Sequence, residues 1–255
     1  MVLETIKLEN FYNAIPFCAS WIGKRKSGKS LSAAMVIHYL VKRKAFDRVI
    51  VFIGTPYCNP ELISIVKRKF DARLIFTAFK EEVLLKIIEQ QKLLRDQNKN
   101  SNILIVWDDI FTSNNRYSHV MNKLFSSGRH WLISCITLCV SWVDIAPSCR
   151  RALDFCVLFS NITYNDTHFL IHNYLNKQLI ETATWALKTN KQYCALVIQT
   201  TGVQQLFLMK FKKKKLDNNP QDSNKECHSK KTHQAIHGKA QSQEELGDSK
   251  NVVVI

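Results

Sequence analysis

The sequence predicts an α/β fold with a central, mostly parallel sheet flanked by helices, followed by a disordered C-terminal tail. Apolar runs of strand length alternate with segments of helical period up to residue 211. Residues 216–250 are rich in Asn, Gln, Ser, Lys and Glu and contain almost no large apolar side chains, so this stretch cannot bury enough surface to order itself. We therefore expect a folded domain at residues 1–211 and a basic patch with a disordered polar tail at residues 212–255.

The expected strands are short apolar runs, and the clearest amphipathic segments are Ser30–Lys44 and Lys80–Arg95. The strands are expected at Phe17–Ile22, Arg48–Ile53, Arg73–Phe76, Ile103–Trp107, Leu132–Val140, Phe155–Phe159, Cys194–Gln199 and Gln205–Phe211. Strands that alternate with helices in this way are typical of a parallel sheet with helices on both faces.

Composition excludes several classes of protein. Hydrophobic residues make up 46% of the chain and charged residues 22%, which is typical of a globular protein and excludes a fibrous one. The longest apolar run, Trp131 to Val143, is about 13 residues and too short to span a bilayer, and the N-terminus has no secretory signal pattern. The eight cysteines are single and form no CxxC pair, which indicates a reducing intracellular compartment.

The chain has a formal net charge of +15, and its positive excess lies before residue 216. Residues 216–255 hold five Lys and six Asp or Glu, so residues 1–215 carry about +16. A domain this basic favours a polyanionic partner such as nucleic acid, with an anionic membrane surface as the weaker alternative. The run Lys212–Lys215 is compatible with a nuclear import signal, a DNA-contacting arm or a solubilising edge.

The strongest motif is a nucleotide-binding P-loop between the first predicted strand and the following helix. Gly23-Lys24-Arg25-Lys26-Ser27-Gly28-Lys29-Ser30 matches G-x-x-x-x-G-K-[ST], whose glycines let backbone N–H groups cradle phosphates. Lys29 is expected to reach the β- and γ-phosphates of ATP and to act in catalysis, and Ser30 to place its hydroxyl on Mg²⁺.

A second acidic element completes a candidate ATPase site. The apolar strand at Ile103–Trp107 ends in Asp108 and Asp109. One carboxylate at this place can hold the Mg²⁺ shell, the role predicted for Asp108. The next can orient or deprotonate the attacking water, the role predicted for Asp109.

Other P-loop classes are less favoured. Asn176-Lys177-Gln178-Leu179 lacks the aspartate that accompanies GTP specificity, and a small-molecule kinase needs no paired acid to activate water. The sequence therefore favours an ATPase that transfers the phosphate to water over a GTPase or a small-molecule kinase.

Together these elements resemble the FtsK–HerA superfamily, and within it the genome-packaging ATPases of poxviruses, related large DNA viruses and virophages. The resemblance spans Phe17 to Phe211. Besides the P-loop and the paired acids, it rests on Gly128-Arg129-His130 before the strand Leu132–Val140 and on Pro147-Ser148-Cys149-Arg150 before the strand Phe155–Phe159.

The resemblance implies a RecA/FtsK-like fold and an ATP-driven translocase that packages double-stranded DNA into a viral capsid. It further implies a ring of subunits, commonly a hexamer, a capsid protein partner, and a location in the virion or in the cytoplasm or nucleus of the infected cell. Arg129 or Arg150 would act as a catalytic arginine on the ATP of the neighbouring subunit, and position favours Arg129. A helicase-type ring ATPase and an assembly protein that holds ATP with little turnover remain the alternatives.

One position departs from the family pattern. A sensor Gln is expected eleven residues after Arg129, and Val140 stands there. Valine cannot form the hydrogen bond by which a glutamine reports the γ-phosphate. Either Ser141 or Thr137 substitutes, or hydrolysis is coupled more weakly to movement.

Overall fold

The computed structural model describes residues 3–112, 115–189 and 193–212. The expected tail at 213–255 lies outside the described residues, and Lys212 is the only part of the basic patch inside them. The division of the chain at residue 211 therefore stays a prediction.

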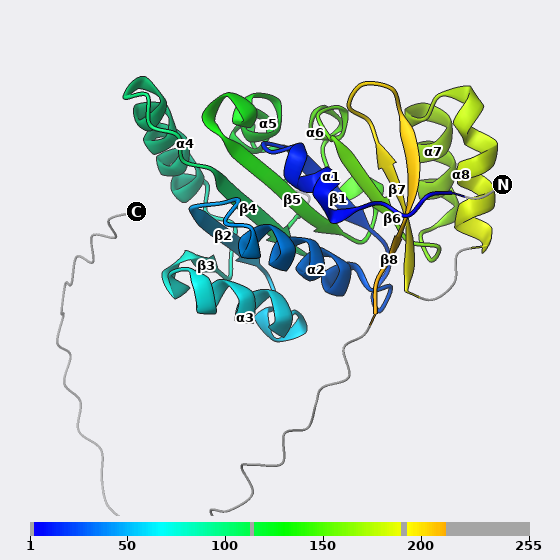
Figure 1. The fold of residues 1–255 in the computed structure, drawn as a ribbon, viewed down its shortest axis with the longest axis horizontal. Helices are drawn as coiled ribbons and strands as arrows, with labels where there is room; N and C mark the ends of the chain where they lie inside the picture. The colour runs from blue at the N-terminus through cyan, green and yellow to red at the C-terminus, as the bar shows by residue number, and fades with distance from the viewer. Residues whose placement is uncertain (1–2, 113–114, 190–192, 213–255) are drawn as a thin grey trace, which may run out of the picture. The chain divides into compact units, whose positions relative to one another are not determined.

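Eight strands form a single sheet in the order β3-β2-β4-β5-β1-β6-β7-β8 (Figure 1). The strands are β1 Cys18–Ile22, β2 Arg48–Ile53, β3 Ile75–Phe76, β4 Ile103–Asp108, β5 Ile133–Cys139, β6 Phe155–Leu158, β7 Cys194–Gln199 and β8 Gln205–Lys210. Strands β1 to β6 pair in parallel. The carboxyl ends of these six strands therefore lie at one edge of the sheet.

Helices cover both faces of the sheet (Figure 1). They are α1 Leu8–Asn13, α2 Lys29–Lys42, α3 Pro60–Lys69, α4 Glu81–Asp96, α5 His119–Ser127, α6 Pro147–Arg151, α7 Tyr164–Tyr174 and α8 Lys177–Thr189. Helices α1, α2 and α3 share a buried apolar cluster with one face, and α4 to α8 share another with the opposite face. Because side chains alternate along a strand, strands buried on both faces read as continuous apolar runs.

The α/β fold with a mostly parallel sheet is confirmed, with two differences in detail. All eight expected strands are present, but Ala72–Leu74 forms a 3₁₀ turn, so only Ile75–Phe76 of the third run is strand. Strands β7 and β8 pair antiparallel to their neighbours. The five-residue connection from Gln199 to Gln205 requires the antiparallel pairing of β7 with β8, since a parallel pair needs a crossover of a dozen or more residues.

Most of the described phenylalanine, tryptophan and cysteine side chains lie in the core. Trp21, Trp107 and Trp142 are almost completely buried. Five of the seven described cysteines are buried, and all seven carry free thiols. No helix in the described ranges is long and apolar enough to cross a membrane.

Candidate nucleotide-binding site

The P-loop and the paired acids meet at the carboxyl edge of the sheet. Strand β5 lies between β1, which enters the P-loop, and β4, which ends in Asp108. The N–H of Gly23 donates to the Cys139 carbonyl (3.2 Å), and the N–H of Asp109 donates to the adjacent Leu138 carbonyl (3.3 Å). The two motifs therefore stand at the same level, two strand spacings or about 10 Å apart.

The P-loop places its lysine inside the loop. Gly28 caps helix α2 in the left-handed region (φ 98°), which glycine adopts without strain. The buried Lys29 ammonium donates to the Gly23 carbonyl (2.7 Å), and the buried hydroxyl of Ser27 has no hydrogen-bond partner within the described residues. An unpaired buried hydroxyl beside a lysine at a helix N-terminus fits an anionic ligand such as a phosphate.

Two aromatic rings support this loop from the sheet side. A Cβ on Gly23 would lie 2.9 Å from Phe159 Cβ, and one on Gly28 would lie 2.5 Å from the Phe211 ring. The two rings contact each other edge-on, with centroids 5.9 Å apart. Any larger residue at Gly28 would therefore displace Phe211 as well as strain the loop.

Asp108 is buried at the end of β4 and is held by an asparagine. Its Oδ2 accepts a hydrogen bond from Asn59 Nδ2 (2.9 Å), and Asn59 also caps α3 by accepting from the Leu62 N–H (3.3 Å). Burial raises the pKa of Asp108, while the Asn59 hydrogen bond opposes that shift. The Asp108 carboxylate and the Ser30 hydroxyl are hard oxygen donors of the kind that Mg²⁺ prefers.

We expect Asn59→Ala and Asn59→Ser to lower ATP turnover by about tenfold or more, since both remove the amide that orients Asp108. Their stabilities should differ. Alanine also loses the α3 cap at a cost of about 0.5–2 kcal/mol, whereas serine retains a capping oxygen. Turnover assays and urea unfolding of both variants check this; wild-type turnover in Asn59→Ser would mean that the amide does not matter.

Asp109 faces a pocket at the same edge. Its backbone is left-handed (φ 49°), an uncommon conformation that Asp tolerates better than most residues, and its side chain is exposed. The pocket has a volume of about 350 Å³ and is lined by Arg25, Thr55, Asp109, Phe111, Leu138, Cys139, Val140 and Asp144. A P-loop arginine and a free carboxylate thus face the same space.

Val140 lies in this pocket, but neither proposed substitute for the sensor does. The Ser141 hydroxyl donates to Asp166 (2.7 Å), and Ser141 caps the short turn that follows. Thr137 is buried, with its hydroxyl 3.5 Å from the Ala19 carbonyl. In this conformation both hydroxyls donate to groups inside the protein.

Arg129 lies at the opposite edge of the sheet, just before β5, and pairs with Asp154. Its Nη2 is 2.9 Å from Asp154 Oδ1; the aspartate side chain is 3% exposed and the arginine 43%. Burial raises the pKa of Asp154, and the Cys18 N–H (2.7 Å) and the Arg129 guanidinium oppose that shift. Arg129 therefore has an ion-pair partner within its own chain.

We expect Arg129→Ala to lose about 1–3 kcal/mol of stability at neutral pH, because it leaves a buried carboxylate poorly compensated. The loss should shrink as pH falls. Without the arginine, the folded-state pKa of Asp154 rises further above its unfolded value, so the penalty is full above that pKa and disappears below it. Adding Asp154→Asn should restore most of the stability, as measured by urea unfolding; a loss that is independent of pH and not rescued would contradict this role.

Arg150 lies on α6 against aromatic rings. Its Nε donates to the Ile145 carbonyl (2.7 Å), and its guanidinium lies over the Trp142 and Phe169 rings, 5.5 and 5.7 Å from their centroids. Burial lowers the pKa of Arg150. The structure therefore places neither candidate arginine in its own subunit's nucleotide pocket.

A P-loop at the end of β1 and a carboxylate pair at the end of β4, with β5 between these two strands in the sheet, define a P-loop NTPase. The chain belongs to the poxvirus A32 protein family, whose model matches residues 7–205, and this is a family of viral genome-packaging ATPases. The resemblance seen in the sequence is thereby confirmed.

One curated relative is an uncharacterized protein, 075L of Invertebrate iridescent virus 6, which is 28% identical over 157 residues. The match covers 60% of this chain, and the chain spans only 58% of the length of that relative.

Solved structures share the fold. The genome packaging NTPase B204 of Sulfolobus turreted icosahedral virus 2, in complex with AMP, gives a TM-score of 0.58 at 16% identity, over 76% of this chain and 96% of that one. The DNA-packaging ATPase B204 of Sulfolobus Turreted Icosahedral Virus gives 0.58 at 18% identity, over 77% and 98%. The cytoplasmic domain of the Type VII secretion ATPase EccC of Thermomonospora curvata gives 0.52 at 13% identity, over 76% and 25%.

Proposed function

We propose that this protein is an ATP-hydrolysing double-stranded DNA translocase that packages a viral genome into a capsid. The observation that carries the proposal is that the P-loop with its lysine and two adjacent carboxylates lie on either side of β5 at the same edge of the sheet. Asp109 is open to the pocket there. The family and the folds of packaging ATPases support the packaging role. The proposed locations are the virion and the cytoplasm or nucleus of the infected cell, with a capsid protein as partner.

The chemistry is hydrolysis of the terminal phosphoanhydride of ATP. Asp109 accepts a proton from a water molecule as the water oxygen bonds to the γ-phosphorus, and the bond to the β-phosphate oxygen breaks to release ADP. Lys29 and the N–H groups at the start of α2 hold the phosphates and offset their charge. Ser30 and Asp108 would hold Mg²⁺, which when bound neutralises charge on the β- and γ-phosphates.

The positive charge of the domain supports binding to duplex DNA through its phosphates. With about +16 on residues 1–215, affinity should fall steeply as salt rises and depend little on base sequence. Equal affinity at low and physiological salt would argue against this mode of binding.

The ring with a shared site is tested by mixing inactive subunits. We expect Arg129→Ala/Asp154→Asn subunits, which keep their fold by the argument above, to be inactive alone and to regain part of their turnover when mixed with Lys29→Ala subunits. A mixed interface pairs an intact P-loop with an intact arginine, which neither variant has alone. If turnover is not regained although native mass shows that the two variants assemble together, Arg129 is not the arginine that acts on the neighbour's ATP. Arg150 would then be the candidate, to be tested in the same way.

The most informative experiment for the proposed function is ATP hydrolysis with and without double-stranded DNA. Turnover stimulated by the duplex, without separation of its strands, is expected. ATP-dependent strand separation would favour the helicase alternative. Tight ATP binding with negligible turnover would favour the assembly protein, which the apolar Val140 in the pocket supports.

A further inference from the structure

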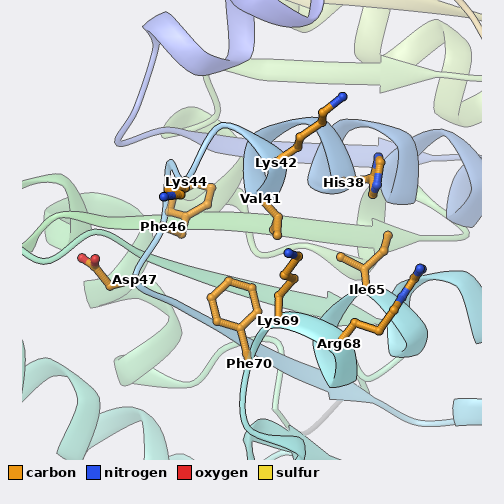
Figure 2. A pocket seen from close by; sticks show the side chains of 10 residues that line it. All are labelled: His38, Val41, Lys42, Lys44, Phe46, Asp47, Ile65, Arg68, Lys69 and Phe70. Carbon is orange, nitrogen blue, oxygen red and sulfur yellow. The ribbon is translucent and has the colours of Figure 1, made fainter.

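A second recess lies between α2 and α3 and is separate from the nucleotide pocket (Figure 2). It has a volume of about 460 Å³ and is lined by His38, Val41, Lys42, Lys44, Phe46, Asp47, Ile65, Arg68, Lys69 and Phe70. These residues come from the last turns of α2, the connection to β2, and the end of α3. The recess therefore opens towards the amino edge of the sheet, away from the P-loop.

The rim of this recess is strongly basic. Lys42, Lys44, Arg68 and Lys69 are all exposed, and none of them forms an ion pair within the part of the chain that the structure describes. The one carboxylate in the lining, Asp47, accepts a hydrogen bond from the Asn102 N–H (2.9 Å). It lies at one side of the recess in Figure 2. Four exposed cations around one recess, with a single carboxylate among the lining residues, favour an anionic ligand.

The floor of the recess is apolar. Val41, Phe46 and Ile65 are buried, and Phe70 is half-buried beside them. In Figure 2, Lys42, Lys44 and Arg68 lie around these four, and Lys69 extends between Val41, Ile65 and Phe70. A ligand that matches both parts carries acidic groups and an apolar group that can leave water. A DNA backbone offers phosphates and sugars but no large apolar side chain.

We propose that this recess binds an acidic segment of a partner protein, with an apolar side chain between its carboxylates placed on the Val41–Phe46–Ile65–Phe70 floor. This site goes beyond the proposed function and does not depend on it. The occupant would not compete with ATP, because the recess borders the last turns of α2, and the P-loop precedes the first.

The test uses the full chain and a fluorescein-labelled peptide in which Glu alternates with Leu. Fluorescence anisotropy should show saturable binding, weakened about tenfold or more by Lys42→Glu/Lys69→Glu, because reversing two charges of the recess, one from each helix, converts attraction into repulsion. The matched control is Lys67→Glu/Lys86→Glu, which reverses two exposed lysines outside the recess and should change affinity less than about twofold. Both variants should keep wild-type ATP turnover and melting temperature.

Two further probes separate the contributions. Replacing Leu by Ser in the peptide, or Glu by Gln, should each weaken binding about tenfold. Equal binding of the Leu and Ser peptides would mean that the recess attracts the peptide by charge alone, and it would overturn the proposal. So would failure of the Glu–Leu peptide to bind, or equal losses in the recess and control variants.

Duplex DNA and the protein itself are the other possible occupants. If Lys42→Glu/Lys69→Glu weakens binding of duplex DNA as strongly as binding of the peptide, the surface belongs to nucleic acid and the proposal fails. If the same variant changes the native mass of the protein, the recess is an interface between copies and the proposal also fails. Unchanged DNA affinity and unchanged mass are the expected results.

Discussion

Replacing Lys29 with alanine is expected to reduce ATP turnover by at least about 10²–10³-fold and to weaken nucleotide binding. The Lys29 ammonium is buried inside the P-loop and donates to the Gly23 carbonyl at 2.7 Å. When a phosphate binds, its charged oxygens would replace this carbonyl oxygen as the acceptor. Loss of the ammonium would leave negative charge on the terminal phosphates uncompensated in a place with little solvent. Phosphate release and equilibrium binding of a labelled ATP analogue measure the two effects.

The matched control for this variant is Lys86→Ala, which removes an exposed lysine from α4. It should keep wild-type turnover and affinity. Turnover near the wild-type level in Lys29→Ala would show that residues 23–30 are not the phosphate-binding loop.

Replacing Asp109 with asparagine should preserve binding of ATP and Mg²⁺ while lowering turnover by about 10²–10⁴-fold, because an amide does not accept the proton of the attacking water. The substitution is well suited to the site. Asn, like Asp, tolerates the left-handed backbone seen at this position, so the loop should keep its shape.

Asp108→Asn is the companion variant and should act on the metal instead. We expect it to weaken the dependence of nucleotide binding on Mg²⁺, since Asp108 is the buried carboxylate oriented by Asn59. If Asp109→Asn loses binding while Asp108→Asn retains it, the two roles are reversed.

Much of the fold was predictable because its signals are local. Most of the apolar runs stand apart from their neighbours in the sequence, and the strand starting at Arg48 begins and ends where expected. The pairing direction of the last two strands depends on the short connection between them, which apolar periodicity does not report. The shortening of the third run to Ile75–Phe76 has a local cause in Asp71, whose side chain accepts from the Arg73 N–H and starts a 3₁₀ turn.

The motifs of the candidate site were also readable in the sequence, but its supporting residues were not. Asn59 contacts Asp108 across 49 positions, and Phe211 reaches Gly28 only because β8 returns along the sheet. Their types and neighbours carry no phosphate-binding signature. Asn59 before Pro60 indicates a helix start, which is a signal for the cap but not for the contact with Asp108.

The contact that Arg129 makes in its own fold was also not predictable from the sequence. The motif that singles it out does not reveal Asp154, which lies 25 positions away at the start of β6 and pairs with it. A proposed role on a neighbouring subunit therefore has to be separated from the contact that Arg129 makes in its own fold, which is why the mixing experiment uses the Asp154→Asn background.

The central claim is that ATP hydrolysis moves this protein along duplex DNA, and the displacement of a third strand tests it most directly. A duplex carrying a bound triplex-forming oligonucleotide is incubated with the protein and ATP. We predict release of the third strand with wild-type protein, with the duplex itself left intact, and none with Lys29→Ala or with a non-hydrolysable ATP analogue. Hydrolysis stimulated by DNA without any release of the third strand would contradict translocation.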